Sequence, residues 1–207
     1  MADLPFQLPA PLGDQLAAAA DIEGKLPRAL ESLGPLAGRD VLLLDVPDGV
    51  LLRRLRDTGI APVVAPLSVP LRIDRPDSSV DALVTLWTGF RGVEAADLAE
   101  ADRVLRPGGR LLVVHDYGRD DVSSLRPSDA PEYATWGRRD GPFLRGGFRL
   151  RVLHCFWTFE SLEAARAFLE AAFGAPGIAL AERLKRPRLS WNVGVYHRWR
   201  GGIDPAE

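Results

Sequence analysis

The sequence predicts an α/β protein with a mostly parallel sheet, and one stretch carries most of that prediction. Apolar residues at helical spacing lead into Arg106-Pro107-Gly108-Gly109, where proline cannot continue a helix and glycine can adopt the positive φ of a tight turn. Residues 111–114 are Leu-Leu-Val-Val, a continuous apolar run typical of a strand covered on both faces. A helix, a tight turn and a buried strand in this order form the repeating unit of a doubly wound sheet.

The same patterns assign the elements before this unit. Helices are predicted over residues 14–22 and 25–33, and Gly34 ends the second. Strands are predicted over 41–46, 62–65 and 82–86, with helices over 51–57 and 93–105. The central strand covers 110–115. We therefore expect a single domain with an N-terminal arm and helices (1–35), a parallel core (41–121) and C-terminal strands with a helix (148–200).

The C-terminal third begins with an alternating segment. In residues 148–156, one face carries Phe148, Leu150, Val152, His154 and Phe156, whereas Arg149 and Arg151 lie on the other. This apolar face is a candidate contact for a homodimer. Thr158 is predicted to cap a helix that Gly174 ends, and residues 178–184 and 191–198 are predicted to form an antiparallel pair across Pro187.

Composition excludes several classes of protein. The 207 residues suffice to bury a core without disulfides or metals, and the single cysteine, Cys155, fits a reducing cytoplasm. A net charge of −2 creates no general attraction for nucleic acid or for an anionic membrane. No stretch approaches the ~20 apolar residues needed to cross a bilayer. We expect a cytoplasmic protein.

Three segments resemble the class I S-adenosylmethionine-dependent methyltransferases, in particular the type 11-like branch. They are EADRVLRPGGRLLVVHDY (100–117), RPDSSVDALVT (75–85) and the stretch from WTFESL (157–162) to Gly174. The resemblance covers residues 41–198. It implies a Rossmann-like, mostly parallel sheet with an antiparallel C-terminal strand, and S-adenosylmethionine as the cofactor, with no metal.

The resemblance also implies where the cofactor chemistry belongs. The family has a glycine-rich turn after its first strand, and in this chain Asp45 matches the leading acid and Gly49 stands for one glycine. Pro47 falls where the first glycine belongs, and its ring adds bulk and fixes φ. Asp48 brings a negative charge to the place where the family meets a carboxylate-bearing ligand. The glycine-rich turn is therefore incomplete.

Two further cofactor devices are missing. Pro66 occupies the place of the acid that binds the ribose hydroxyls, and proline offers neither a side-chain acceptor nor a backbone donor. Only residues 69–80 separate the second strand from the next, whereas a parallel crossover by itself needs about a dozen residues or more. We predict that the usual third strand and its preceding helix are absent.

Four residues remain candidates for the pocket: Asp45, Gly49, Trp87 and His115. His115 or Tyr117 is the candidate to orient or deprotonate a methyl acceptor. The competing structural interpretation is that Trp87 fills the space of the missing unit, while His115 ends its strand in a polar contact. The acids after His115 are too close together in sequence to converge easily on a metal ion.

The leading functional hypothesis is a pseudoenzyme, a methyltransferase-like protein with a degraded cofactor site that acts through a partner or another small ligand. The alternative is an active small-molecule methyltransferase with a rearranged cofactor loop. A weaker alternative is an RNA- or nucleotide-binding module, in which arginines are interleaved with Trp136, Phe143 and Trp191.

Overall fold

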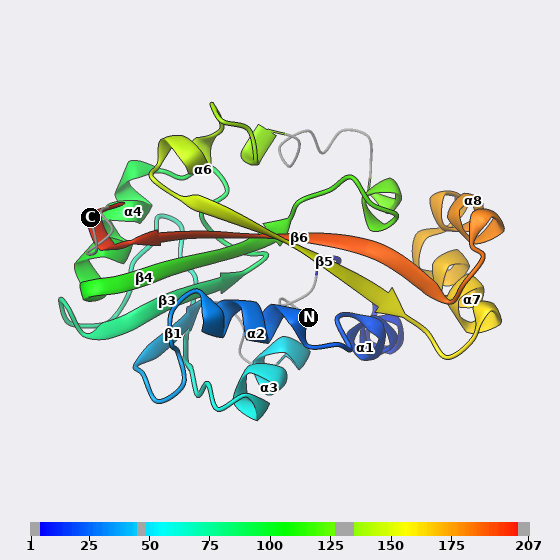
Figure 1. Cartoon of the computed structure of the whole chain (residues 1–207), viewed down its shortest axis with the longest axis horizontal. Coiled ribbons are helices and arrows are strands. Elements are labelled where there is room, and N and C mark those ends of the chain that lie inside the picture. The colour runs from blue at the N-terminus through cyan, green and yellow to red at the C-terminus, as the bar shows by residue number, and fades with distance from the viewer. Residues whose placement is uncertain (1–4, 45–48, 127–134, 203–207) are drawn as a thin grey trace.

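The computed structural model describes residues 5–44, 49–126 and 135–202. Within them, six strands form one sheet (Figure 1). Their bounds are β1 Val41–Leu44, β2 Val63–Ala65, β3 Val80–Leu86, β4 Leu105–Asp116, β5 Arg149–Thr158 and β6 Arg188–Trp199. The order across the sheet is β2-β1-β3-β4-β6-β5. The first four strands are parallel, and β6 is antiparallel to both β4 and β5. The predicted fold class is confirmed.

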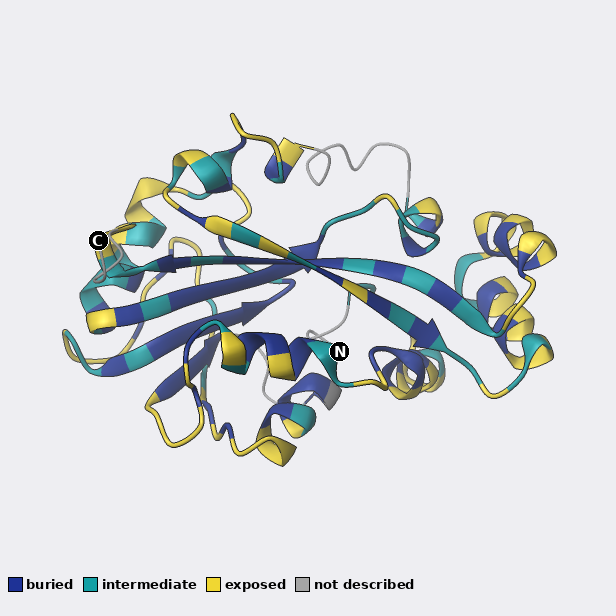
Figure 2. Ribbon diagram, in the orientation of Figure 1, coloured by how far each residue is buried: buried dark blue, intermediate teal, exposed yellow. Residues whose placement is uncertain are grey.

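Helices cover both faces of the sheet (Figure 1). They are α1 Ala10–Ala19, α2 Lys25–Ser32, α3 Val50–Asp57, α4 Ala95–Val104, α6 Pro142–Arg145, α7 Leu162–Phe173 and α8 Ala175–Arg183, with 3-10 turns at Val122–Leu125 and Arg200–Gly202. One core cluster lies beneath α1, α2, α3 and α7, and a second beneath α4 and α6. In β4, Leu112 and Val114 enter the first cluster while Leu111 and Val113 enter the second. This two-sided burial explains the continuous apolar run and the dark centre of the sheet in Figure 2.

The chain between β2 and β3 contains neither a helix nor a strand. Residues 66–79 cross back along α4 instead. The backbone N–H of Leu71 donates to the Asp97 carboxylate (3.2 Å) and that of Ile73 donates to Glu100 (2.8 Å), and both apolar side chains are buried. The predicted loss of a helix–strand unit is confirmed, so β2 forms one edge of the sheet.

The predicted antiparallel pair across Pro187 is wrong. Residues 178–183 belong to α8, and the strands that pair with β6 are β4 and β5. A short apolar run suits either a strand or a buried helix segment, and here tertiary packing decides. Gly177 lets α8 approach α7 so closely that a Cβ there would come within 1.9 Å of the Leu169 carbonyl oxygen.

Several element boundaries also differ from prediction. α1 begins at Ala10 and accommodates Pro11 in its first turn, because the first helical turn does not need the N–H that proline lacks. Thr158 is the last residue of β5, and the cap of α7 is Ser161, whose hydroxyl accepts from the Ala164 N–H (3.1 Å). The described part of the first strand ends at Leu44.

The expected single apolar face of β5 is not continuous. Phe148, just before the strand, is buried in the cluster beneath α6, whereas Leu153, Cys155 and Trp157 on the opposite parity are buried in the other cluster. The strand crosses over β6 along its length, so the covered face changes from one end to the other (Figure 1). The face proposed for a homodimer is therefore partly used inside the monomer.

Candidate functional site

The carboxyl ends of parallel strands meet at one edge of a sheet, and the predicted site residues follow those ends. Gly49 lies between β1 and α3, Trp87 directly follows β3, and His115 lies at the end of β4. In the sheet, Leu44 pairs with Thr85 and Leu86 pairs with Val114. The carboxyl ends of β1, β3 and β4 therefore lie next to one another. Asp45 falls at the same edge by sequence but lies outside the described residues.

On the α1 side of the sheet, Trp87 is part of a buried polar cluster. Its indole N–H donates to Asp116 Oδ1 (2.9 Å), and the indole N–H of Trp191 donates to the same oxygen (3.0 Å). The two indole rings stack with centroids 5.4 Å apart. Arg126 forms an ion pair with the other oxygen of Asp116. Trp87 is 5% exposed and Asp116 is 4% exposed, so this cluster belongs to the packed interior.

On the opposite face, His115 is fully buried at 0% exposure. Its Nε2 lies 3.2 Å from the Gly89 carbonyl oxygen, which can only accept, so Nε2 carries the proton. The centroid of its ring lies 4.6 Å from that of the Trp136 ring and 6.1 Å from that of the Phe143 ring. Burial, followed by the charge of Arg91, lowers the pKa of His115 to about 3. The imidazole is therefore neutral at physiological pH and a weak base.

Tyr117 continues the chain past β4. Its backbone N–H donates to the Asn192 carbonyl oxygen (2.9 Å), which extends the pairing with β6 by one bond. The ring is half-buried, with the guanidinium of Arg119 5.9 Å from its centroid and Gly137 packed against it. Tyr117 therefore retains some access to solvent at the rim, in contrast to His115.

Gly49 is buried and extended, with φ −146° and ψ 163°, at the N-terminus of α3. Its carbonyl oxygen accepts from the Arg53 N–H (3.1 Å) and begins the helix. The position does not require a positive φ.

The acids that follow Tyr117 fix the loop to β6. Asp121 accepts from the N–H (2.8 Å) and the hydroxyl (2.6 Å) of Ser190. Asp120 accepts from the Ser123 N–H (2.7 Å) and from the Asn192 N–H (2.6 Å). These contacts use the carboxylates for structure. In the described ranges, no three acids, histidines or cysteines gather as a metal site would require.

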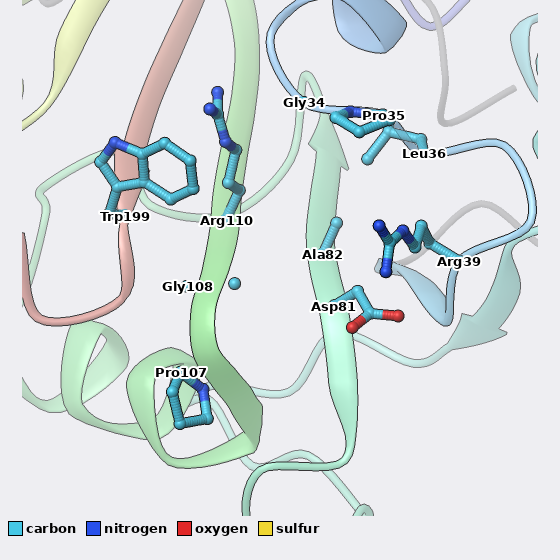
Figure 3. A pocket seen from close by; sticks show the side chains of 11 residues that line it. Gly34, Pro35, Leu36, Arg39, Asp81, Ala82, Pro107, Gly108, Arg110 and Trp199 are labelled. Atoms are coloured by element: carbon cyan, nitrogen blue, oxygen red, sulfur yellow. The ribbon is translucent and has the colours of Figure 1, made fainter. Parts of the chain in front are cut away.

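A cavity of about 200 Å³ lies at the opposite edge of the sheet, at the amino ends of β3 and β4 (Figure 3). The Pro107-Gly108-Gly109 turn lines it, together with Arg110 and Trp199 on one side and Arg39 and Asp81 on the other. The guanidinium of Arg110 lies 3.6 Å from the centroid of the Trp199 ring. The turn that carries the sequence resemblance is therefore remote from the rim that carries the candidate site.

Sequence reasoning missed Asp116 and Arg126, the residues that hold Trp87 in place. A signal was present, because Asp116 alternates with His115 on β4 and so points to the face where Trp87 lies. The contact with Trp191 could not be anticipated, since it depends on β6 lying beside β4.

Among known proteins, similarity to this chain is found only with solved structures. No protein-family model and no curated protein matches the sequence. The sheet order, with β6 reversed between β4 and β5, is the arrangement implied by the resemblance, without its third strand. The chain has a mostly parallel α/β sheet with one reversed strand, the architecture that the sequence resemblance implies.

Three solved structures that contain methyltransferases are similar to this chain. A SAM-dependent methyltransferase from Aquifex aeolicus is 16% identical, with 93% of this chain and 98% of that chain covered and a TM-score of 0.45. A chain from a complex of a Haloferax volcanii methyltransferase activator with a methyltransferase is 19% identical, with 92% and 98% covered and a TM-score of 0.46. A SAM-dependent methyltransferase from Thermotoga maritima is 13% identical, with 89% and 91% covered and a TM-score of 0.43. At these identities and TM-scores the likeness says nothing of activity.

Proposed function

We propose that this protein uses a methyltransferase-type scaffold for binding and does not transfer methyl groups. The observation that carries the proposal is that three described residues at the rim are packed into the interior. Trp87, His115 and Asp116 follow or end the central strands, and each is 5% exposed or less. A cofactor pocket needs concave, accessible space at this edge, and these side chains are committed to internal contacts.

The chain after β2 supports the proposal. Pro66 follows the strand and provides no acceptor for ribose hydroxyls. Residues 66–79 form no further strand beside β2. In the family that the sequence resembles, the residue that contacts the adenine follows this missing third strand. Two of the three local devices that the resemblance implies thus have no counterpart among the described residues.

The chemistry of His115 also favours a structural role. A general base works best with a pKa near the working pH, and burial lowers the pKa of this ring to about 3. Its protonated nitrogen is already used by the Gly89 carbonyl oxygen. Tyr117 is the more accessible of the two catalytic candidates.

The alternative, an active small-molecule methyltransferase with a rearranged cofactor loop, is favoured by one local arrangement. β1 ends at Leu44, and Gly49 begins α3 only a few residues later, as in a nucleotide-binding βα unit. Asp45 lies between them, in the part of the chain that is not described. In this alternative, Asp45, Gly49, Trp87 and His115 line the pocket.

The aromatic residues proposed to stack on RNA or a nucleotide are not accessible. Trp136, Phe143 and Trp191 are all buried, the last two at 0% and 1% exposure. Base stacking requires accessible aromatic faces. These three aromatic residues are therefore not available to stack on a base.

Calorimetric titration with S-adenosylmethionine and S-adenosylhomocysteine tests the proposal, with a thermal-shift measurement on the same samples. We expect no binding heat and no shift of the melting temperature. A ligand at about 100 times its Kd would stabilise the fold by about 2.7 kcal/mol, which a thermal shift detects readily. Micromolar binding that disappears in Asp45→Ala would refute the proposal and support the active enzyme.

A further inference from the structure

The exposed edge of β5 carries a binding surface that the cofactor rim does not involve. β5 lies at one edge of the sheet, and it pairs with β6 along only one of its two sides (Figure 1). On the other side, the C-terminal half of β5 is partly covered. The Asp21 N–H donates to the Phe156 carbonyl oxygen (2.9 Å), and Lys25 Nζ donates to the His154 carbonyl oxygen (2.7 Å).

These two contacts identify which backbone groups of β5 point outward. In an antiparallel ladder, the N–H and C=O of one residue point to the same side, and successive residues alternate. Because Phe156 and His154 point outward, Val152 and Leu150 do so as well. Among the described residues, no backbone group bonds to these two from the open side. The N-terminal half of β5 therefore offers unpaired donors and acceptors.

A groove of about 550 Å³ runs along this open edge, between α2 and β5. Four consecutive strand residues, 151–154, line one side of it, as expected for a groove beside a strand backbone. Residues of α2 form the other side, and Arg151 spans the two elements by donating to the Ser32 hydroxyl (2.8 Å). An extended peptide in this groove would pair with β5 and place alternate side chains against α2.

The charge of the groove is positive. Lys25, Arg28 and Arg151 line it, and no acidic side chain of the described residues does. Lys25 is paired with Glu23 (2.8 Å), whereas Arg28 is exposed and forms no ion pair with a described residue. The positive field extends to His197, whose pKa is lowered by burial and then by Arg110, Arg149 and Arg151.

We propose that the β5 edge binds an acidic, extended segment of a partner protein as an added strand beside α2. Unpaired strand backbone selects a peptide, because a peptide can pair with both its N–H and C=O groups. The positive groove selects acidic side chains. A second copy of the chain is disfavoured because it would bring the arginines of two β5 strands together. RNA is disfavoured because no exposed aromatic side chain lines the groove.

This inference gives the partner role proposed above a location, and the two can fail separately. The groove lies along β5, whereas the cofactor question concerns the ends of β1, β3 and β4. S-adenosylmethionine binding would refute the proposed function and leave the docking edge standing. Absence of peptide binding in the titration described below would refute the docking edge and leave the proposed function standing.

The test is a fluorescence-anisotropy titration with a short labelled peptide that alternates threonine and glutamate. A peptide that alternates threonine and lysine is the charge control. We expect the acidic peptide to bind and the basic one not to bind. Arg151→Glu and Arg28→Glu should each weaken binding about threefold to tenfold, whereas Arg139→Glu, an exposed arginine outside the groove, should leave it unchanged.

A second variant tests strand addition itself. Val152→Pro removes an outward N–H without removing a bond of the β5–β6 ladder, and proline is tolerated at sheet edges. Peptide binding should be lost while the melting temperature stays within a few degrees of the parent. In the parent protein, hydrogen exchange of the Leu150 and Val152 amides should slow when the peptide is added, which does not depend on the variant folding.

Several results would overturn the proposal. They are no binding of the acidic peptide up to about 1 mM, binding that Val152→Pro and Arg151→Glu leave unchanged, and no slowing of exchange at Leu150 and Val152. Displacement of the acidic peptide by an RNA oligonucleotide at lower concentration would assign the groove to nucleic acid. A dimer in light scattering that Val152→Pro dissociates would assign it to a second copy of the chain.

Discussion

His115 shows how one buried side chain limits what this rim can do. Among the described residues, the ring has one hydrogen-bond partner, the Gly89 carbonyl oxygen, and it packs against Trp136 and Phe143. Protonation would place a charge in that apolar surrounding, which is why burial lowers its pKa. A histidine at the end of a central strand is a natural catalytic candidate from sequence, but its surroundings decide its chemistry.

The burial of His115 predicts a pH dependence of stability. The pKa is about 3 in the folded protein and 6.5 for the reference group, so the unfolded chain binds more protons between these values. The free energy of unfolding should therefore be highest above pH 6.5 and fall as the pH decreases, by up to about 1.4 kcal/mol per pH unit. His115→Gln, which keeps a donor for Gly89, should flatten this slope.

Urea unfolding of the parent and His115→Gln, from neutral pH to about pH 4, measures the effect. His197→Gln is the matched control, because the pKa of His197 is also lowered and contributes with the same sign. The His197 variant should keep most of the slope. Equal slopes in the parent and His115→Gln would show that His115 is not held neutral.

At the scale of elements, α4 holds the segment that stands where the family has a helix and a strand. Arg103 donates to the carbonyl oxygens of Ile73 (2.9 Å) and Arg75 (2.9 Å), and it pairs with Asp77 (2.7 Å). It also pairs with Glu100 (2.9 Å), which in turn accepts from the Ile73 N–H. Side chains of one helix thus satisfy backbone groups that have no secondary structure of their own.

Arg103→Met should detach this segment. We expect the free energy of unfolding to fall by about 1–2 kcal/mol, because several partners lose their donor. Hydrogen exchange over residues 71–77 should become faster, whereas Arg106→Met, which removes pairs with Asp40 and Asp81, should leave that segment protected. Unchanged exchange in Arg103→Met would refute the role of α4.

The same variant has a pH signature. The hydrogen bonds from Arg103 lower the pKa of Glu100 to about 2, from a reference value of 4.5. Its stabilising contribution is therefore complete above pH 4.5 and is lost as the pH falls toward 2. Acid denaturation should be less steep in Arg103→Met than in the parent over this range.

At the scale of the whole molecule, the sheet has two edge strands, β2 and β5, and they differ in length and charge. β2 has three residues, whereas β5 has ten and carries the exposed Arg149 and Arg151 in its first half (Figure 2). A long open edge promotes pairing between copies, and charged side chains suppress it. A separate property of the whole molecule is that the described residues include no helix with the length and hydropathy of a membrane span.

Replacing both edge arginines should reveal this protection. We expect the parent protein to be monomeric in light scattering and the double variant Arg149→Thr, Arg151→Thr to self-associate. Arg138→Thr with Arg139→Thr, two exposed arginines away from the edge, is the control and should remain monomeric. A parent that is already dimeric, or a double variant that stays monomeric, would show that these arginines do not guard the edge.

Local sequence patterns were sufficient to predict the α/β class, the central strand and the missing unit between β2 and β3. These features depend on local signals: the Pro107-Gly108-Gly109 turn, the apolar run of β4, and too few residues for a crossover. Such patterns did not determine the α8 helix, because a short apolar run fits a helix or a strand until α7 packs against it.

The contacts and burial of the rim residues depend on tertiary packing and could not be predicted from local patterns. Trp87, Asp116, Arg126 and Trp191 come from separate parts of the chain, and their contacts exist because β6 lies beside β4. The open side of β5 is likewise a property of strand order, which no local pattern encodes. Backbone and burial patterns are local and can be read from sequence, whereas solvent access and pKa depend on which distant segments pack together.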